Sequence, residues 1–166
     1  PTPARPETPP SPPCSIPFHR DPDFVDRGTL LDQIREKCSA PASRIALVGL
    51  GGVGQSQLAI EHCHRTAERS PEQWVFWVHA SNIARLEQGY RDIADKVKLA
   101  GREDPQADVF KLVHNWLQNE KNGKWLLVLD NADDGATLSL PVNNSQETRT
   151  GGRNSAYPRS LSSYLP

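Results

Sequence analysis

Two short runs of this sequence are apolar at nearly every position rather than at alternate positions. They are Trp74–His79 (WVFWVH) and Trp125–Leu129 (WLLVL). A strand carries apolar side chains on both faces when both faces of its sheet are covered, which is typical of parallel sheets with helices on each side. A third apolar run, Arg44–Val48 (RIALV), ends at a glycine and predicts another such strand.

Helical patterns separate these runs. Apolar residues recur every three or four positions in segments that begin near Gly28, Ser56, Asn82 and Val109. Alternating strands and helices, with strands apolar on both faces, indicate a parallel sheet covered by helices. We therefore predict an α/β fold, a partial P-loop NTPase-type parallel sheet of three strands with flanking helices.

The two ends of the chain differ in composition from its middle. Nine of the fifteen prolines lie within residues 1–22. Proline fixes φ and lacks an N–H group, so this segment is predicted to be a disordered linker that forms neither a helix nor a strand ladder, with a PxxP ligand as the alternative. Residues 135–166 are rich in Ser, Thr, Asn, Gly and Pro, and they predict a disordered low-complexity tail or insertion. The predicted domain is residues 23–134.

Charge and cysteine content exclude several classes of protein. The 19 Lys and Arg residues nearly balance the 20 Asp and Glu residues, which argues against a nucleic-acid partner. No apolar run approaches the roughly 18 residues of a membrane span, so we expect no membrane partner. The three cysteines lack CxxC spacing, which favours reduced thiols and a cytoplasmic protein. Because the sequence contains no methionine, we interpret it as a fragment.

A glycine-rich segment joins the first predicted strand to the helix near Ser56. Its sequence, GLGGVGQS over Gly49–Ser56, matches the phosphate-loop pattern G-x-x-x-x-G-K-[ST] except at the lysine. Glycines allow successive N–H groups to face one concavity, and the helix start adds its positive end. The alternative is a glycine-rich turn that serves only tight packing. The candidate phosphate-binding residues are Gly49, Gly51, Gly52, Val53, Gly54, Gln55, Ser56 and Gln57.

Gln55 stands where the pattern requires lysine. A hydrogen bond to a charged group contributes about 1.5–3 kcal/mol, so its loss predicts binding on the order of 10- to 150-fold weaker. Phosphoryl transfer depends on positioning and electrostatic stabilisation, so the same substitution predicts little hydrolysis.

Asp130 follows the apolar run Trp125–Leu129 directly. Parallel sheets bind ligands beyond the carboxyl ends of their strands, so we predict that Asp130 and the Ser56 hydroxyl support one Mg²⁺ ion. The next residue is Asn131, whose amide cannot act as a general base. We therefore assign no catalytic residue, and surface acids Asp133 and Asp134 are less favoured substitutes.

Three pieces together resemble the NB-ARC domain, a STAND-class nucleotide switch, and most of all its form in fungal NLR-like proteins. These pieces are Phe24–Arg27 leading into Leu30 and Leu31, Gly49–Ser56, and Trp125–Asp134. The resemblance covers roughly residues 17–134, the N-terminal part of that domain. It implies ADP or ATP binding coupled to signalling, in a longer protein with repeat and effector domains and a homo-oligomeric active form.

The resemblance also implies roles for individual residues. Phe24, Val25 and Arg27 would contact adenine and ribose, the glycine loop would hold the phosphates, and Asp130 would support Mg²⁺. Two departures, Gln55 for lysine and Asn131 for a second acid, leave two alternatives. One is a nucleotide-free scaffold or truncated gene product, and the other is an active NTPase, at most a weak ATPase.

Two further groups of residues are given structural roles. Adjacent side chains on a helix diverge by about 100°, so His62, Cys63 and His64 are not expected to bind one metal ion. The four tryptophans are expected in the core. His79 ends a predicted strand and could lie near the ligand crevice, but a structural role is favoured.

Overall fold

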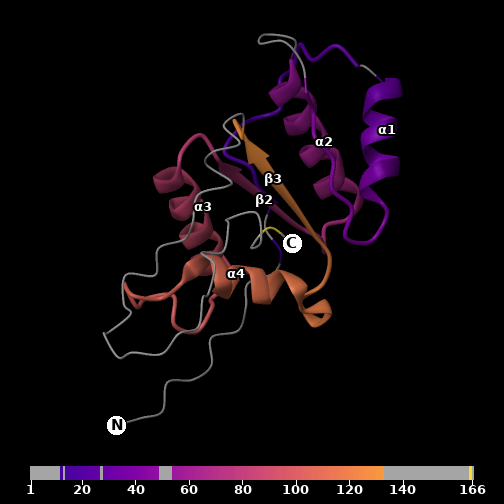
Figure 1. The fold of residues 1–166 in the computed structure, drawn as a ribbon. Coiled ribbons are helices and arrows are strands. Elements are labelled where there is room, and N and C mark those ends of the chain that lie inside the picture. The colour runs from indigo at the N-terminus through magenta and orange to yellow at the C-terminus, as the bar shows by residue number, and fades with distance from the viewer. Residues whose placement is uncertain (1–11, 13, 27, 49–53, 133–164, 166) are drawn as a thin grey trace, which may run out of the picture. The chain divides into compact units, whose positions relative to one another are not determined.

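The computed structural model describes residues 12, 14–26, 28–48, 54–132 and 165. Helices separate the three strands along this part of the chain (Figure 1). In order, the elements are β1 (Cys14–Ser15), α1 (Gly28–Cys38), α2 (Gln55–Arg69), β2 (Trp74–His79), α3 (Ile83–Lys96), α4 (Val109–Gln118), the short 3₁₀ helix η1 (Glu120–Asn122) and β3 (Trp125–Asp130). The predicted α/β class is confirmed.

The three strands form one sheet in the order β1-β2-β3. β1 pairs with β2 in parallel, with Cys14 opposite Val75. At the start of β2 the Trp74 N–H donates to the Lys124 carbonyl at 2.9 Å, and just past its end the Ala80 N–H donates to the Asp130 carbonyl at 2.7 Å. The β3 residues that pair with β2 therefore follow one another in the same direction as the residues of β2, so β3 is parallel to β2. The predicted parallel three-stranded sheet is confirmed.

One of the three strands is not the one predicted. Residues 44–48 form no strand, and Val48 is 89% exposed. The third strand is instead β1, inside the proline-rich segment, so the prediction that residues 1–22 form no ladder is wrong at Cys14–Ser15. A strand exists only beside a hydrogen-bonded neighbour, and both sides of β2 are occupied by β1 and β3. β1 can form because Cys14, Ser15 and Ile16 keep their N–H groups between two prolines.

The chain divides into two compact units. We call Pro10–Trp77 with Glu120–Val128 the α2 unit, and Val78–Asn119 with the segment from Leu129 onward the α3–α4 unit. None of the described helices combines the length and apolar character that a membrane span needs.

In the α2 unit, the core forms where α2 meets the strands. Ile60 and Cys63 of α2 pack with Val75 and Trp77 of β2, and the partly buried Leu126 of β3 joins them. The Phe18 ring meets the Trp77 ring edge-on with 5.4 Å between centroids, and Trp74 stacks on Phe76 at 5.8 Å. Trp74 and Trp77 are therefore core residues, as predicted, whereas Trp116 and Trp125 are only half-buried. α1 lies beside α2 (Figure 1).

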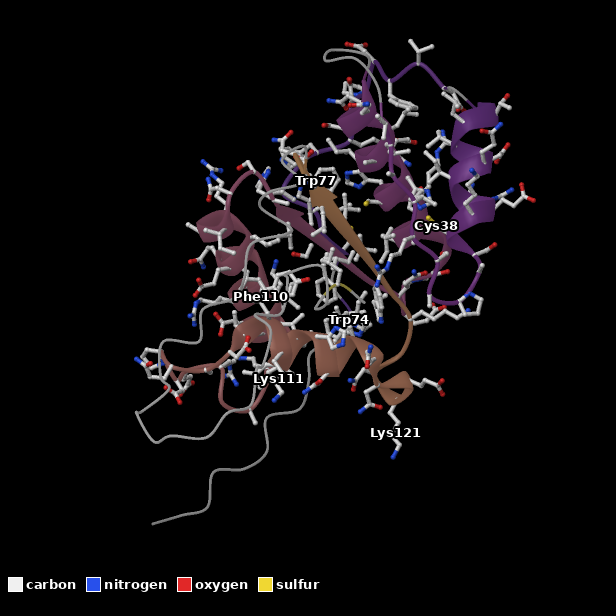
Figure 2. The ribbon with its side chains drawn as sticks, in the orientation of Figure 1. Cys38, Trp74, Trp77, Phe110, Lys111 and Lys121 are labelled. Carbon is white, nitrogen blue, oxygen red and sulfur yellow. The ribbon has the colours of Figure 1, made fainter. Side chains whose placement is uncertain are left out.

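In the α3–α4 unit, both helices begin with side-chain caps. The Asn82 carboxamide oxygen accepts from the Arg85 N–H at 2.9 Å, and Asp108 caps α4 in the same way. Neighbouring residues of α4 point to opposite sides of the helix in Figure 2, with Lys111 outward and Phe110 against Tyr90 of α3 at 4.9 Å between ring centroids.

Gly89 allows α3 to approach β2 closely. A Cβ atom at this position would lie 2.5 Å from Cγ1 of Val78, a residue that is itself 1% exposed. No real Cβ contact is that short, so the observed packing requires glycine at position 89.

Candidate functional site

Gly54 precedes α2 in the left-handed region of backbone conformation, with φ 82° and ψ 26°. A Cβ atom there would meet nothing within 4 Å, so the backbone angle and not the available space requires glycine. The Gly54 carbonyl accepts from the Leu58 N–H at 3.0 Å, which makes Gly54 the N-cap of the helix. The last glycine of the predicted phosphate loop thus has a left-handed backbone conformation, which favours glycine. Gly49, Gly51, Gly52 and Val53 lie outside the described residues.

The first turn of α2 carries Gln55, Ser56 and Gln57. Gln55 is half-buried, and Ser56 and Gln57 are exposed. This turn contains no acidic residue, and Gly54 provides no side-chain cap for its N–H groups. The positive end of the helix dipole is therefore not offset by a carboxylate of that turn, which favours an anion there.

Asp130 ends β3, and its side chain is 15% exposed. Its Oδ2 lies 3.4 Å from Nδ1 of His79, the last residue of β2. Asn131 follows with a positive φ of 57°, so the chain turns directly after the aspartate. From the sequence, His79 was expected to end a strand, but its pairing with Asp130 was not predicted. The sequence shows that each residue ends an apolar strand segment, and the structure shows that these two strands are neighbours.

Ser56 belongs to the α2 unit and Asp130 to the α3–α4 unit, so their predicted sharing of one Mg²⁺ ion stays a prediction. Among the described residues no cluster of three or more His, Cys, Asp or Glu side chains forms a metal site. His62 and Cys63 are buried, and His64 Nε2 lies 3.1 Å from the Phe18 carbonyl oxygen.

The predicted base-contacting residues lie on the segment Arg20–Asp26. Phe24 is half-buried and Val25 is 76% exposed, whereas Arg27 lies outside the described residues. The Asp21 carboxylate accepts from the Asp23 N–H at 2.9 Å, and the Asp21 carbonyl accepts from the Phe24 N–H at 3.2 Å. The first of these bonds forms an Asx turn, and Phe24 and Val25 lie directly after it.

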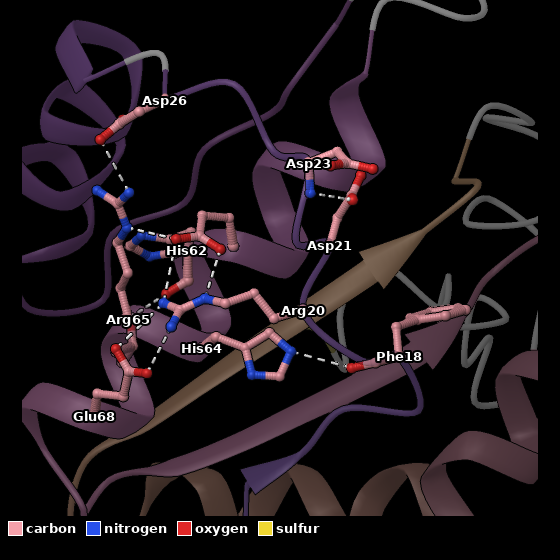
Figure 3. Close-up of polar contacts among 11 residues, drawn as sticks. Phe18, Arg20, Asp21, Asp23, Asp26, His62, His64, Arg65 and Glu68 are labelled. Carbon is pink, nitrogen blue, oxygen red and sulfur yellow. Dashed lines mark hydrogen bonds and ion pairs between the residues drawn. The ribbon is translucent and has the colours of Figure 1, made fainter.

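Glu61 of α2 holds this segment through two arginines (Figure 3). Its side chain is 7% exposed, and its oxygens accept from Arg20 Nε at 2.9 Å and from Arg65 Nε at 2.7 Å. Burial alone would raise the pKa of the Glu61 carboxyl, but the hydrogen bonds from Arg20 and Arg65 outweigh it and hold the pKa below its ordinary value. Glu61 is therefore a buried, ionised acceptor at neutral pH.

Each arginine also reaches a second carboxylate. Arg65 Nη2 donates to Asp26 at 3.2 Å, and Arg20 Nη1 donates to Glu68 at 2.7 Å. The Glu61–Arg65 spacing of one helical turn was a visible signal in the sequence, but nothing there marked Arg20, which lies in the predicted linker.

Cys63 is fully buried in the α2 unit. Burial, with smaller contributions from Cys14 and Cys38, raises the pKa of its thiol to about 12. Burial, reinforced by Arg69, lowers the pKa of the neighbouring His62. A protonated, inaccessible thiol is a poor nucleophile, so Cys63 serves packing.

Comparison with known proteins adds one relative. The chain is similar to an NLR-like protein. This "Nucleotide-binding leucine-rich repeat (NLR)-like protein" of Hyaloscypha variabilis is 34% identical to it over 157 residues, or 92% of this chain. The chain spans 15% of the length of that relative. No protein-family model matches the chain, and no solved structure matches it.

The matched stretch is longer than residues 23–134, so it extends into the flanking segments. Because the match covers 92% of the chain, and each flanking segment is longer than the unmatched 8%, parts of both the proline-rich start and the polar tail are matched to the relative. In the structure, the proline-rich start is joined to the α2 unit, because Ile16 packs against the core and Arg20 binds Glu61.

Proposed function

We propose that this chain is a nucleotide-binding module of an NLR-like signalling switch, which binds ADP or ATP weakly and hydrolyses little. The observation that carries the proposal is the left-handed Gly54 directly before α2, within the segment GLGGVGQS. The name of the 34% identical relative, a nucleotide-binding leucine-rich repeat (NLR)-like protein, supports the same conclusion.

In this proposal the phosphates bind main-chain N–H groups of Gly49–Gly54 and the first turn of α2. The neutral Gln55 side chain replaces a lysine, so the main chain supplies most of the binding. Phe24, Val25 and Arg27 contact the base and ribose, with Gln57 at the edge of the phosphate site.

Ser56 and Asp130 are the proposed Mg²⁺ ligands. An exposed hydroxyl and a carboxylate are hard oxygen donors, which suit Mg²⁺. When bound, the ion would neutralise charge on the outer phosphates. Asp130 would present its carboxylate from the end of β3, beside the His79 imidazole.

We assign no catalytic residue, because Asn131 offers no base beside Asp130. The chain would act within a longer cytoplasmic protein, together with repeat and effector domains, and that protein would form homo-oligomers. The 15% coverage of the relative supports a longer parent protein.

Isothermal titration calorimetry of the 166-residue chain with Mg-ADP and Mg-ATP tests this function. Restoring the charge with Gln55→Lys is expected to tighten binding on the order of 10- to 150-fold. Gln57→Lys is the matched control, because it adds the same charge to the same turn of α2 at an exposed position. It should change the affinity far less.

Each outcome has a distinct meaning. Equal gains from both lysines would show that general charge, not the loop position, sets the affinity. If neither the unmodified chain nor Gln55→Lys binds at millimolar nucleotide, the chain is a nucleotide-free scaffold. Steady phosphate release by the unmodified chain would favour the active NTPase.

A further inference from the structure

The segment Arg20–Asp26 is attached to α2 at both of its ends, and both attachments lead to Glu61. At its first residue, Arg20 donates to Glu61 at 2.9 and 3.2 Å. At its last residue, Asp26 accepts from Arg65, which itself donates to Glu61 at 2.7 Å. Figure 3 shows the two guanidinium groups converging on the same part of α2. We call Arg20, Asp26, Glu61, Arg65 and Glu68 the clamp.

We propose that the clamp positions Phe24 and Val25 for the base of the bound nucleotide, with Glu61 and Arg65 as its positioning residues. The inference rests on the proposed function and adds residues that neither the phosphate-loop pattern nor the family resemblance assigns. Its prediction is that the clamp sets affinity for the base and leaves affinity for the phosphates unchanged.

The first step is that Glu61 serves both arginines from a buried position. Glu61 is 6% exposed as a whole residue, and each of its two carboxylate oxygens accepts at least one hydrogen bond. Arginine forks that donate to a carboxylate through two nitrogens fix direction as well as distance. Arg20 makes such a two-nitrogen contact with Glu61 and another with Glu68.

The second step is that the segment between the attachments needs them. The Asx turn at Asp21 and the Phe24–Asp21 bond are both short-range, so they order the segment internally but do not attach it to α2. Val25 is 76% exposed, so its burial does not hold this end of the segment. When a ligand binds a mobile loop, ordering the loop costs conformational entropy and weakens binding. A loop that is already held in place avoids this entropy cost.

The third step is that the clamp and the phosphate end share one helix. α2 begins at Gln55, and Glu61 lies six residues later, about 9 Å along the axis of an α-helix. Arg65, four residues after Glu61, lies one turn further. A single rigid element therefore carries both the proposed phosphate site and the attachment of the base segment.

Calorimetry with two ligands tests the clamp in the 166-residue chain. Mg-ADP reports on base and phosphates together, and inorganic pyrophosphate with Mg²⁺ reports on the phosphate site alone. Arg65→Met and Asp26→Asn should each weaken Mg-ADP binding by roughly 3- to 10-fold, the effect of leaving a side chain to be ordered on binding. Pyrophosphate affinity should stay within about twofold.

Arg91→Met on α3 is the matched control. It breaks the Arg91–Glu87 pair, which has the same one-turn spacing and the same 2.7 Å distance as Arg65–Glu61. The affinities of Arg91→Met for Mg-ADP and for pyrophosphate should equal those of the unmodified chain. The Asp26→Asn variant controls for misfolding in Arg65→Met. The Asp26 side chain is 61% exposed, and replacing it leaves the contacts of Glu61 with Arg20 and Arg65 in place.

Hydrogen exchange of residues 21–26 without any ligand separates the clamp from the proposed function. Arg65→Met should speed exchange in this segment, and Arg91→Met should not. Unchanged exchange, or an equal loss of Mg-ADP and pyrophosphate affinity, would overturn the positioning role. If the unmodified chain binds neither ligand, the proposed function fails and the base role fails with it, whereas the exchange result still reports on the clamp.

Discussion

The α3–α4 unit and the α2 unit hold their parts by different contacts. In the α3–α4 unit, apolar stripes of two helices face each other, and the Tyr90 and Phe110 rings are in contact. The Val78 side chain packs in the space that the missing side chain of Gly89 leaves. The α2 unit also has an apolar core, but its N-terminal segment is attached by arginines that converge on one buried carboxylate. The first kind of contact follows from the helical period, and the second joins residues 41 positions apart.

The two kinds of contact should respond differently to substitution. Apolar packing responds to volume and is insensitive to pH. A buried ion pair contributes little net stability, but removing one partner leaves the other charge buried and unpaired, which is destabilising. The variants below separate these responses, with unfolding followed by urea denaturation.

Gly89→Leu should have the largest effect. The new side chain must occupy space that the buried Val78 already fills, so we expect a loss of about 3 kcal/mol or more in the free energy of unfolding. Ala84→Leu, at an exposed position of the same helix, is the control and should stay within about 0.5 kcal/mol. If Gly89→Leu were as stable as the control, the close approach of α3 to β2 would be wrong.

Glu61→Gln should have a moderate effect that depends on pH. At pH 7 we expect a loss of about 1–2 kcal/mol, reduced from the buried-pair range because Arg20 is 41% exposed. The folded-state pKa of Glu61 is lowered, so its contribution is complete above the unfolded pKa of about 4.3 and is lost as the pH falls through the folded value.

Urea denaturation at several pH values checks this prediction. The stability gap between the unmodified chain and Glu61→Gln should be constant from pH 7 to about pH 5 and should narrow below that. Glu87→Gln, which removes the 42% exposed carboxylate of the Arg91 pair, should cost less than about 0.5 kcal/mol. A gap that widens on acidification would contradict the lowered pKa of Glu61.

Tyr90→Phe should have the smallest effect. Among the described residues the buried Tyr90 hydroxyl has no hydrogen-bond partner, and burial raises its pKa to about 12. Removing an unsatisfied hydroxyl should leave stability unchanged or raise it by up to about 1 kcal/mol. Tyr90→Leu, which also loses the contact with Phe110, should be destabilised, and a Phe variant as unstable as the Leu variant would indicate a hidden partner for the hydroxyl.

The sequence predicted most of the regular structure. The strand Trp74–His79 was predicted with the observed bounds, and α2 begins one residue before its predicted start. Such segments carry their own apolar period. Residues 44–48 carry an apolar run as well, yet β1 holds the place beside β2 instead, because strand formation depends on which neighbour is available.

The candidate site stays a prediction, and the sequence marks only the part of it that a local pattern records. Gly54, the last glycine of the phosphate-loop pattern, has a positive φ, and the other loop glycines lie outside the described residues. The clamp was missed because charged residues are usually solvated, and the partners of Glu61 lie 4 and 41 positions away. Pairing of His79 with Asp130 needed the strand order, which the sequence leaves open.

The most direct test of the central claim follows backbone amide resonances during the Mg-ADP titration of the 166-residue chain. The claim is that main-chain N–H groups before α2 bind a diphosphate although Gln55 replaces the lysine. We predict saturable shifts at the amides of Gly49–Gly54 and Ser56, and smaller ones at Phe24 and Val25. Shifts confined to other regions, or none at millimolar Mg-ADP, would contradict the account.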